Sequence, residues 1–472
     1  MADKERPYLF YDVAVSICAT CFRKVDAKIV FEGGKVYMLK RCPQHGSERV
    51  LMADDVDYYR KCREVFLKPP EMPNRYNTPV KWGCPYDCGL CTDHEQHSCL
   101  TLIEITDFCN LRCPICYAGS GPERVQHRDF ATIERMLDAV VANERRPDVV
   151  QISGGEPTLH PEFFRILDAA RARPIQHLML NTNGLRIASD PEFAERLAGY
   201  TPGFELYLQF DSFDEGPLRE LRGVDLRSVR EKALARLNAL GISTTLVVTV
   251  KRGTNDHELG KIIEYGVKQP CVRGVVFQPI QAAGRLQGFD AAQNRLTLTE
   301  VRRRILEQTK LFRPEDIIPV PCHPDSLAMG YALKIGGEIT PLTGLIDPQV
   351  LINGGRNTIV FESDEAVQKA VFKTFSTNHS PESATSTLRD LLCCLPKVGA
   401  PEGIGYQNVF RVLIMQFIDA HSFDVRSVKK TCVHIAHPDG KRMIPFDTYN
   451  LFYRDELEQT RLRPVRETVG VG

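Results

Sequence analysis

Between residues 100 and 280 the sequence alternates short β-rich apolar runs with amphipathic segments, and this alternation limits the possible folds more than any other feature. It predicts a parallel sheet with right-handed crossovers, built either as an open doubly wound sheet or as an incomplete barrel. In both folds ligands bind at the carboxyl ends of the strands. The predicted strands are 100–106, 148–153, 177–182, 204–211, 243–250 and 272–279, and the predicted helices between them are 131–144, 160–172, 226–241 and 256–267.

The chain of 472 residues is longer than one hydrophobic core usually supports, so we expect several parts. A Cys-rich first part ends in the Pro-punctuated linker 69–79, and a second short Cys-rich segment precedes the strand–helix domain. The last part is expected to be mostly helical, with helices at 298–312 and 408–423. The predicted boundaries are 1–78, 79–99, 100–290 and 291–472.

Charge and hydropathy exclude several classes of partner. Sixty basic residues balance sixty acidic ones, which gives no support for a nucleic-acid partner. The first twelve residues, MADKERPYLFYD, lack the apolar core of a signal peptide, and no run reaches the ~18 apolar residues of a membrane span. We therefore expect a cytoplasmic protein, with a peripheral contact to a membrane left open.

The chain has sixteen cysteines, and most of them are clustered. A reducing compartment disfavours disulfides, so clustered thiols there indicate metal sites. The first group, Cys18, Cys21, Cys42 and His45, consists of two knuckles joined by a hairpin predicted over 27–41 with Gly-Gly at its turn. Three thiolates and one imidazole suit a closed tetrahedral zinc site, with rubredoxin-type iron as the alternative.

The second group lies in the stretch 84-CPYDCGLCTDHEQHSC-99. Cys84, Cys88 and Cys91 have the spacing C-x3-C-x2-C, and Cys99 follows closely enough to supply a fourth thiolate. His94 or His97 are alternatives to Cys99, although thiolate is the commoner cluster ligand. Four ligands would close an auxiliary iron–sulfur cluster used for electron relay or structure, and a zinc site is the competing interpretation.

The third group, Cys109, Cys113 and Cys116, repeats that spacing directly after the first predicted strand. No fourth cysteine follows before Cys271. If these three thiolates bind three irons of a [4Fe–4S] cluster, the fourth iron keeps an open coordination position. An open position is typical of a metal site that performs chemistry.

The triplet, its following aromatic residue Tyr117 and the stretch 153-SGGEPT-158 after the second strand resemble the radical S-adenosylmethionine (SAM) superfamily. This resemblance implies a partial (β/α)6 barrel in which SAM completes the cluster. It also implies that Gly154, Gly155 and Glu156 receive the amino group of SAM. Glycines expose backbone carbonyls, and a carboxylate pairs with an ammonium at charge-assisted strength.

Further cofactor contacts are expected at later strand ends. The resemblance places polar residues of 181-NTNG-184, Asn183 among them, near the ribose, and Tyr117 near the adenine. Gln209 and Asp211 are two polar residues pointing inward from a buried strand, so they need partners, and we expect contact with cofactor or substrate.

Nearly the whole chain resembles one subgroup, which contains tetraether synthase and proteins described as methyltransferases acting on a pterin precursor. It implies a 5′-deoxyadenosyl radical that attacks unactivated carbons, a low-potential electron donor of ferredoxin or flavodoxin type, and a lipid or a pterin as substrate. Coupling of lipid hydrocarbon chains is the leading hypothesis, and pterin methylation is the alternative. A plain electron-transfer protein is disfavoured, because it needs neither SGGEP nor an open cluster.

The same resemblance implies a further iron–sulfur cluster in the C-terminal region. Cys322 and Cys432 are the candidate ligands, and Cys271 is an additional one. Aspartate stands at position 447, where the subgroup leads us to expect cysteine, which weakens the prediction of a complete cluster. Cys393 and Cys394 lie in an apolar run and are predicted to be core residues.

Overall fold

The computed structural model describes residues 6–353 and 408–469, so Cys393 and Cys394 lie outside the described residues. Six parallel strands form its centre and are neighbours in chain order. They confirm the predicted strands, because each predicted run overlaps one of them and no end differs by more than two residues. The six are β5 (Leu100–Thr106), β7 (Val149–Gly154), β8 (His177–Thr182), β9 (Phe204–Gln209), β10 (Thr244–Val250) and β11 (Val272–Pro279).

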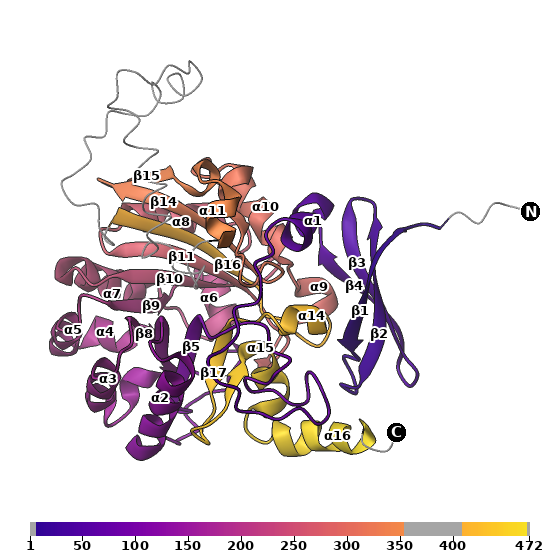
Figure 1. Cartoon of the computed structure of the whole chain (residues 1–472). Helices are drawn as coiled ribbons and strands as arrows, with labels where there is room; N and C mark the ends of the chain where they lie inside the picture. Colours follow the sequence, from indigo (N-terminus) through magenta and orange to yellow (C-terminus); the bar gives the residue numbers. More distant parts are fainter. Residues whose placement is uncertain (1–5, 354–407, 470–472) are drawn as a thin grey trace, which may run out of the picture.

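Helices connect these strands and bury their apolar faces against the sheet (Figure 1). Ile133, Leu137 and Val140 of one helix, spaced three or four residues apart, are fully buried, which is the stripe an amphipathic helix needs. The helices are α2 (Phe130–Glu144), α3 (Phe163–Arg171), α4 (Leu185–Ser189), α5 (Pro191–Ala198), α6 (Glu215–Arg222), α7 (Arg227–Leu240) and α8 (Leu259–Lys268). Strand–helix alternation therefore produces the partial barrel that the sequence predicted.

The C-terminal region extends this sheet at both edges. β16 (Val409–Met415) runs parallel to β11, and β17 (Val433–Ala436) runs parallel to β5. β14 (Leu327–Ile335) pairs antiparallel with β16. In the described part of the chain β13 and β15 lie at one edge of the sheet and β18 at the other, so the sheet is open. The remaining strands are β13 (Ile318–Pro319), β15 (Glu338–Pro341) and β18 (Met443–Pro445), and the helices include α10 (Leu298–Gln308), α14 (Val425–Val428), α15 (Phe446–Thr448) and α16 (Arg463–Val469).

The predicted helix over 408–423 is wrong, because its first half forms strand β16. Phe410, Val412 and Ile414 are fully buried, whereas Val409, Arg411 and Leu413 between them are partly exposed. This alternation has the period of two that is typical of a strand. The helix predicted at 298–312 is confirmed in α10. The C-terminal region thus combines helices with strands instead of being mostly helical.

The N-terminal part is a four-stranded antiparallel sheet followed by one helix, and it lies beside the main domain (Figure 1). The predicted hairpin is confirmed, with Gly33 and Gly34 at its turn in the left-handed region (φ +58° and +75°). Lys40 joins this sheet to the C-terminal region, since its Nζ donates to the carbonyls of Ala420 and His421 at 2.8 and 2.9 Å. The elements are β1 (Leu9–Ile17), β2 (Lys24–Glu32), β3 (Lys35–Cys42), β4 (Gly46–Ala53) and α1 (Val56–Glu64).

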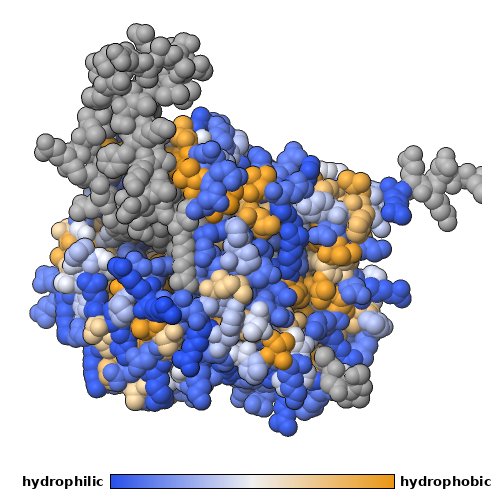
Figure 2. Space-filling model, in the orientation of Figure 1, coloured by the Kyte–Doolittle hydropathy of each residue, from blue (hydrophilic) through white to orange (hydrophobic). Residues whose placement is uncertain are grey.

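The surface is mixed in hydropathy (Figure 2). Apolar side chains are exposed on the N-terminal sheet, where Leu9, Val13 and Val15 of the edge strand β1 face solvent. Among the described residues, no helix is long and apolar enough to cross a membrane.

Candidate active site

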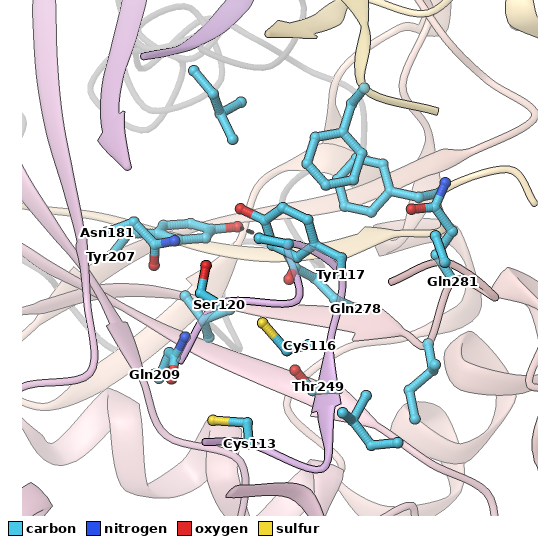
Figure 3. A pocket seen from close by; sticks show the side chains of 18 of the residues that line it. Cys113, Cys116, Tyr117, Ser120, Asn181, Tyr207, Gln209, Thr249, Gln278 and Gln281 are labelled. Carbon is cyan, nitrogen blue, oxygen red and sulfur yellow. Dashed lines mark hydrogen bonds between the residues drawn. The ribbon is translucent and has the colours of Figure 1, made fainter. Parts of the chain in front are cut away.

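A cavity lies inside the partial barrel, next to the three cysteines of the third group. Cys109, Cys113 and Cys116 line it together with Tyr117, and Figure 3 shows Cys113 and Cys116 on one side with Tyr117 and Tyr207 beyond them. The other uncharged polar lining residues are Ser120, Gln151, Asn181, Asn183, Gln209, Thr249, Gln278 and Gln281. The predicted cysteine triplet and the predicted polar strand ends thus face one space.

The loop that carries the triplet is anchored by Arg285. Its Nε donates to the Cys113 carbonyl at 2.7 Å, and its Nη1 donates to the Gly119 carbonyl at 3.3 Å. Burial raises the pKa of the Cys113 thiol, and the guanidinium of Arg222 opposes that shift. The loop therefore presents its thiols from a backbone that is already held in place.

Gly154 and Gly155 let two backbone segments approach each other closely. A Cβ on Gly155 would lie 2.2 Å from the Phe108 carbonyl oxygen, and one on Gly154 would lie 2.3 Å from the Thr106 carbonyl oxygen. The backbone N–H of Gly155 donates to Thr106 at 2.7 Å, and that of Glu156 donates to Phe108 at 2.8 Å. The glycine pair thereby fastens the end of β7 to the start of the cysteine loop.

The Glu156 carboxylate is directed into the protein and does not line the cavity. It accepts hydrogen bonds from the hydroxyls of Thr158 (2.6 Å) and Thr182 (2.8 Å) and from the backbone N–H of Asn183 (2.8 Å). Burial raises the pKa of Glu156, which these donors oppose. In this arrangement Glu156 ties the end of β8 to the glycine turn, and its predicted pairing with an ammonium stays a prediction.

Tyr117, Asn183 and Gln209 line the cavity, as the sequence led us to expect for residues near the cofactor. Asn183 also donates from Nδ2 to Asn110 Oδ1 at 2.8 Å, which links the end of β8 to the cysteine loop. The Tyr117 ring lies 5.0 Å from the ring of Phe446, and the Arg454 guanidinium lies 5.4 Å from its centre.

Asp211, which we expected to contact cofactor or substrate, is fully buried and is not among the residues that line the cavity, so that contact stays a prediction. It accepts two hydrogen bonds from Arg222 (2.8 and 2.6 Å) and one from Arg230 (2.9 Å). Arg222 is the residue that sequence reasoning missed: among the described residues it is the one cationic side chain that lines the cavity. Its position at a helix end, followed by Gly223, gave no signal without knowledge of its carboxylate partner.

We expect Asp211→Asn to lower the free energy of unfolding by about 3 kcal/mol, because it leaves two buried guanidiniums without their countercharge. Freed from its partner, Arg222 should also lose its position beside Cys113. Chemical denaturation and equilibrium binding of SAM measure the two effects. Asp225→Asn, which removes a half-buried partner of the exposed Arg227, is the matched control and should change neither quantity. Unchanged stability in the Asp211 variant would contradict this role.

The first cysteine group is assembled as predicted. Ligand atoms of Cys18, Cys21, Cys42 and His45 all lie within 4.8 Å of one another. The backbone N–H of Gln44 and the ring of His45 lower the pKa of the Cys42 thiol to about 6. The chemistry and geometry of this donor set fit a tetrahedral metal ion.

The second group is not assembled as predicted, because Cys99 lies elsewhere. Its Sγ lies within 4.8 Å of those of Cys322 and Cys432, which are themselves 3.5 Å apart. Cys84, Cys88 and Cys91 instead line a small cavity with Asp93 and His94. Cys99 directly precedes β5, and Cys432 directly precedes β17. Because β17 pairs parallel to β5, the two cysteines are brought together.

His97 lies beside the group Cys99–Cys322–Cys432. Its Nε2 lies 3.6 Å from Cys99 Sγ, and its Nδ1 lies 2.9 Å from a Glu144 carboxylate oxygen. A carboxylate on the far nitrogen is the usual support of a metal-binding histidine.

Two further candidates for this group lie elsewhere. Cys271 is buried at the start of β11, with its backbone N–H bonded to Asn238, and does not join the group. Asp447, fully buried with its pKa raised by burial to about 6, accepts from the Ile418 N–H and the Thr431 hydroxyl. In this arrangement Asp447 supports neighbouring backbone.

Two family models match separate parts of the chain. A family model described as "Radical SAM superfamily" matches residues 103–266, and one described as "HMPTM N-terminal zinc ribbon domain" matches residues 10–54. Solved structures similar to part of the chain include Streptococcus suis SuiB bound to precursor peptide SuiA (17% identity, 46% of each chain, TM-score 0.39) and a radical SAM methyltransferase from Sphaerobacter thermophilus (12%, 64% of this chain and 74% of that chain, 0.32).

An α/β partial barrel with an open cysteine triplet at its strand ends defines a radical SAM protein. A GTP 3′,8-cyclase of Alkaliphilus oremlandii is 30% identical over 52% of this chain and 72% of its own length. A 7,8-dihydro-6-hydroxymethylpterin dimethyltransferase of Methanocaldococcus jannaschii is 30% identical over 96% of both chains. The chain belongs to the family of this M. jannaschii protein within the radical SAM superfamily.

Proposed function

We propose that the chain is a radical SAM enzyme that couples hydrocarbon chains of lipids by forming a carbon–carbon bond. When bound, the cluster and SAM supply a primary carbon radical that removes hydrogen from an unactivated carbon. Each coupling would take one hydrogen from each of two chains and leave two molecules of 5′-deoxyadenosine. The protein's part is to hold the reactants in position and to exclude water.

The residues of the cavity fit SAM and its cluster. Cys109, Cys113 and Cys116 would hold three irons, and the fourth would receive the amino-acid end of SAM. Arg222, beside Cys113, suits the carboxylate of that end. Tyr117 and Asn183 would contact the nucleoside.

The observation that carries the lipid proposal is the apolar lining in the part of the cavity away from the cysteine triplet. Leu100, Leu102, Val247, Met415 and Val433 line it, and Leu100 begins its strand, so apolar lining extends toward the amino ends of the strands. Among the described lining residues there is no Asp or Glu. An alkyl chain needs an apolar path and no countercharge.

Methylation of a pterin is the second candidate. A pterin is flat and carries amide-like edges, which the rings of Tyr117 and Tyr207 and the amides of Asn181, Gln209 and Gln278 would suit. The name of the M. jannaschii relative also favours it. Against it, adjacent N–H donors on the pterin edge pair best with a carboxylate, and the described lining offers none.

The test is expression of the chain in an anaerobic host whose lipids are unlinked, followed by mass spectrometry of core lipids and pterins. Wild type should yield cross-linked chains that have lost two hydrogens per new bond, and Cys113→Ala should yield none. Unchanged lipids together with a methylated pterin would overturn the lipid proposal in favour of the second candidate. The electron donor and a peripheral membrane contact stay predictions.

We also propose two separate auxiliary metal sites, one held by Cys84, Cys88 and Cys91 and one held by Cys99, Cys322 and Cys432 with His97 nearby. The sulfur atoms of Cys99, Cys322 and Cys432 lie within 4.8 Å of one another, whereas Cys84, Cys88 and Cys91 line a separate small cavity, and this supports the division. Iron–sulfur clusters suit these thiolate sets, and zinc or iron suits the ribbon group.

Double variants test this division. Cys99→Ala and Cys432→Ala should each remove the same bound metal, so the double variant should lose no more than either single one. Cys99→Ala combined with Cys91→Ala should lose the metal of both sites, so its loss should equal the sum of the two single losses. Iron, zinc and sulfide content with electron paramagnetic resonance measure the losses. Additive loss for Cys99 with Cys432, or shared loss for Cys99 with Cys91, would contradict the division.

A further inference from the structure

A basic surface surrounds Trp82, the one tryptophan of the chain. The Lys81 ammonium and the Arg466 guanidinium each lie 4.5 Å from the centre of its ring. Lys24 donates from Nζ to the Trp82 carbonyl at 3.2 Å. Three segments distant in sequence, namely the ribbon knuckle, the loop before Cys84 and helix α16, therefore meet at this indole. We call this region the Trp82 surface.

The Trp82 surface is rich in cationic side chains, whereas the chain as a whole has no net charge. Lys24, Lys81 and Arg463 are exposed. In the contacts described for this surface, only Arg463 has a carboxylate partner, Glu467 at 3.2 Å. Lys24, Lys81 and Arg466 contact Trp82, and Arg463 precedes Arg466 by three residues in α16. The Arg461 guanidinium lies 3.9 Å from the centre of the Phe22 ring, and Arg23 follows Phe22 in the chain. The surface thus offers several unpaired cations around a half-buried aromatic ring, although the chain has no net charge.

The same surface lies over two cysteine groups. Cys84 is half-buried and follows Trp82 by two residues. The Tyr86 hydroxyl donates at 2.8 Å to the carbonyl of Phe22, the residue after Cys21, and Lys24 lies 5.3 Å from the Tyr86 ring. A protein bound here would therefore sit beside Cys84 of one predicted metal site and Cys21 of another.

We propose that the Trp82 surface docks a small acidic protein that carries one electron at a time, and that the electron enters through the site of Cys84, Cys88 and Cys91. This inference rests on the proposed function, which consumes one electron for each SAM that is cleaved. Complementary charge speeds encounter and sets orientation. Tryptophan and arginine are the residue types that most often dominate binding energy at a protein interface.

The test is the rate at which reduced flavodoxin, as an acidic one-electron carrier, reduces the clusters of the metal-loaded chain without SAM or lipid. The variant K81E with R463E should be reduced about tenfold more slowly than wild type at low salt, and the difference should shrink at high salt because ions screen exposed charges. Titanium(III) citrate, which needs no docking, should reduce both proteins at the same rate. The variant E467Q, which removes the carboxylate paired with Arg463 and leaves Asp87 bonded to the backbone of residues 81–83, should be reduced faster by flavodoxin.

The matched control reverses two exposed cations on the outer helices α7 and α8, Lys232→Glu with Lys268→Glu, and should leave the flavodoxin rate unchanged. Equal slowing in this control, slowing with titanium(III) citrate, or no slowing in K81E with R463E would overturn the proposal. Loss of binding to a short RNA with an unchanged flavodoxin rate would assign the surface to a nucleic acid instead. Because the assay omits SAM and lipid, failure of the lipid proposal would not affect its result.

Discussion

Replacing Cys113 with alanine should abolish cleavage of SAM to 5′-deoxyadenosine, and the protein should lose the iron of one cluster. Cys113 lies in the middle of the triplet and beside Arg222, so its loss removes one of three protein ligands of the cluster. With two thiolates left, the cluster has no complete protein site. Anaerobic reduction in the presence of SAM, with chromatography of the nucleoside product and iron analysis, measures both losses.

Cys271→Ala is the matched control, because Cys271 is equally buried but lies at the opposite end of a barrel strand, with no cysteine among its described contacts. It should keep its iron and its product. If Cys113→Ala still formed 5′-deoxyadenosine at the rate of this control, the assignment of the triplet as the cluster site would fail.

Replacing Gly155 with alanine should weaken the binding of SAM without removing any ligand of the cluster. The new Cβ would lie 2.2 Å from one backbone carbonyl oxygen, of Phe108, and 2.9 Å from another, of Asp107, so backbone must move. Overpacking of this kind costs up to about 3 kcal/mol of unfolding free energy. The segment that moves leads into the cysteine loop, so SAM binding should fall about a hundredfold. Denaturation and equilibrium dialysis with labelled SAM measure the two changes.

Gly216→Ala is the control for this prediction. Gly216 lies in helix α6, and a Cβ there would meet no atom within 4 Å. Alanine at a helical glycine should raise the unfolding free energy by about 0.5–1 kcal/mol and leave SAM binding unchanged. If both alanine variants had the same stability and bound SAM equally well, the close backbone approach at Gly155 would not be needed for SAM binding.

The six barrel strands were predictable because each is a short apolar run buried on both faces, and such runs are recognisable without knowledge of their neighbours. The cysteine triplet was predictable as a unit because its three thiols come from one loop. Segment 408–423 was misread as a helix, since its apolar residues also fit a helical period and only the pairing with β11 and β14 selects a strand.

The division of the remaining cysteines could not be predicted from spacing. Cys99 is close in sequence to Cys91, but the pairing of β17 with β5 brings Cys432 to it across more than 300 residues of chain. Asp211 was predicted as a cofactor contact because polar groups in buried strands need partners, and the partners proved to be two arginines of the protein.

By itself, then, the sequence determined the alternating strands and helices, the ribbon with its four candidate ligands and the cysteine triplet followed by a glycine turn, because each of these depends on residues close together in the chain. Only the tertiary structure decided which distant side chains meet: Arg222 with Cys113, Cys99 with Cys322 and Cys432, and the cations around Trp82. The physical reason is that strand pairing and buried ion pairs join segments far apart in the chain, and no local period or spacing records them.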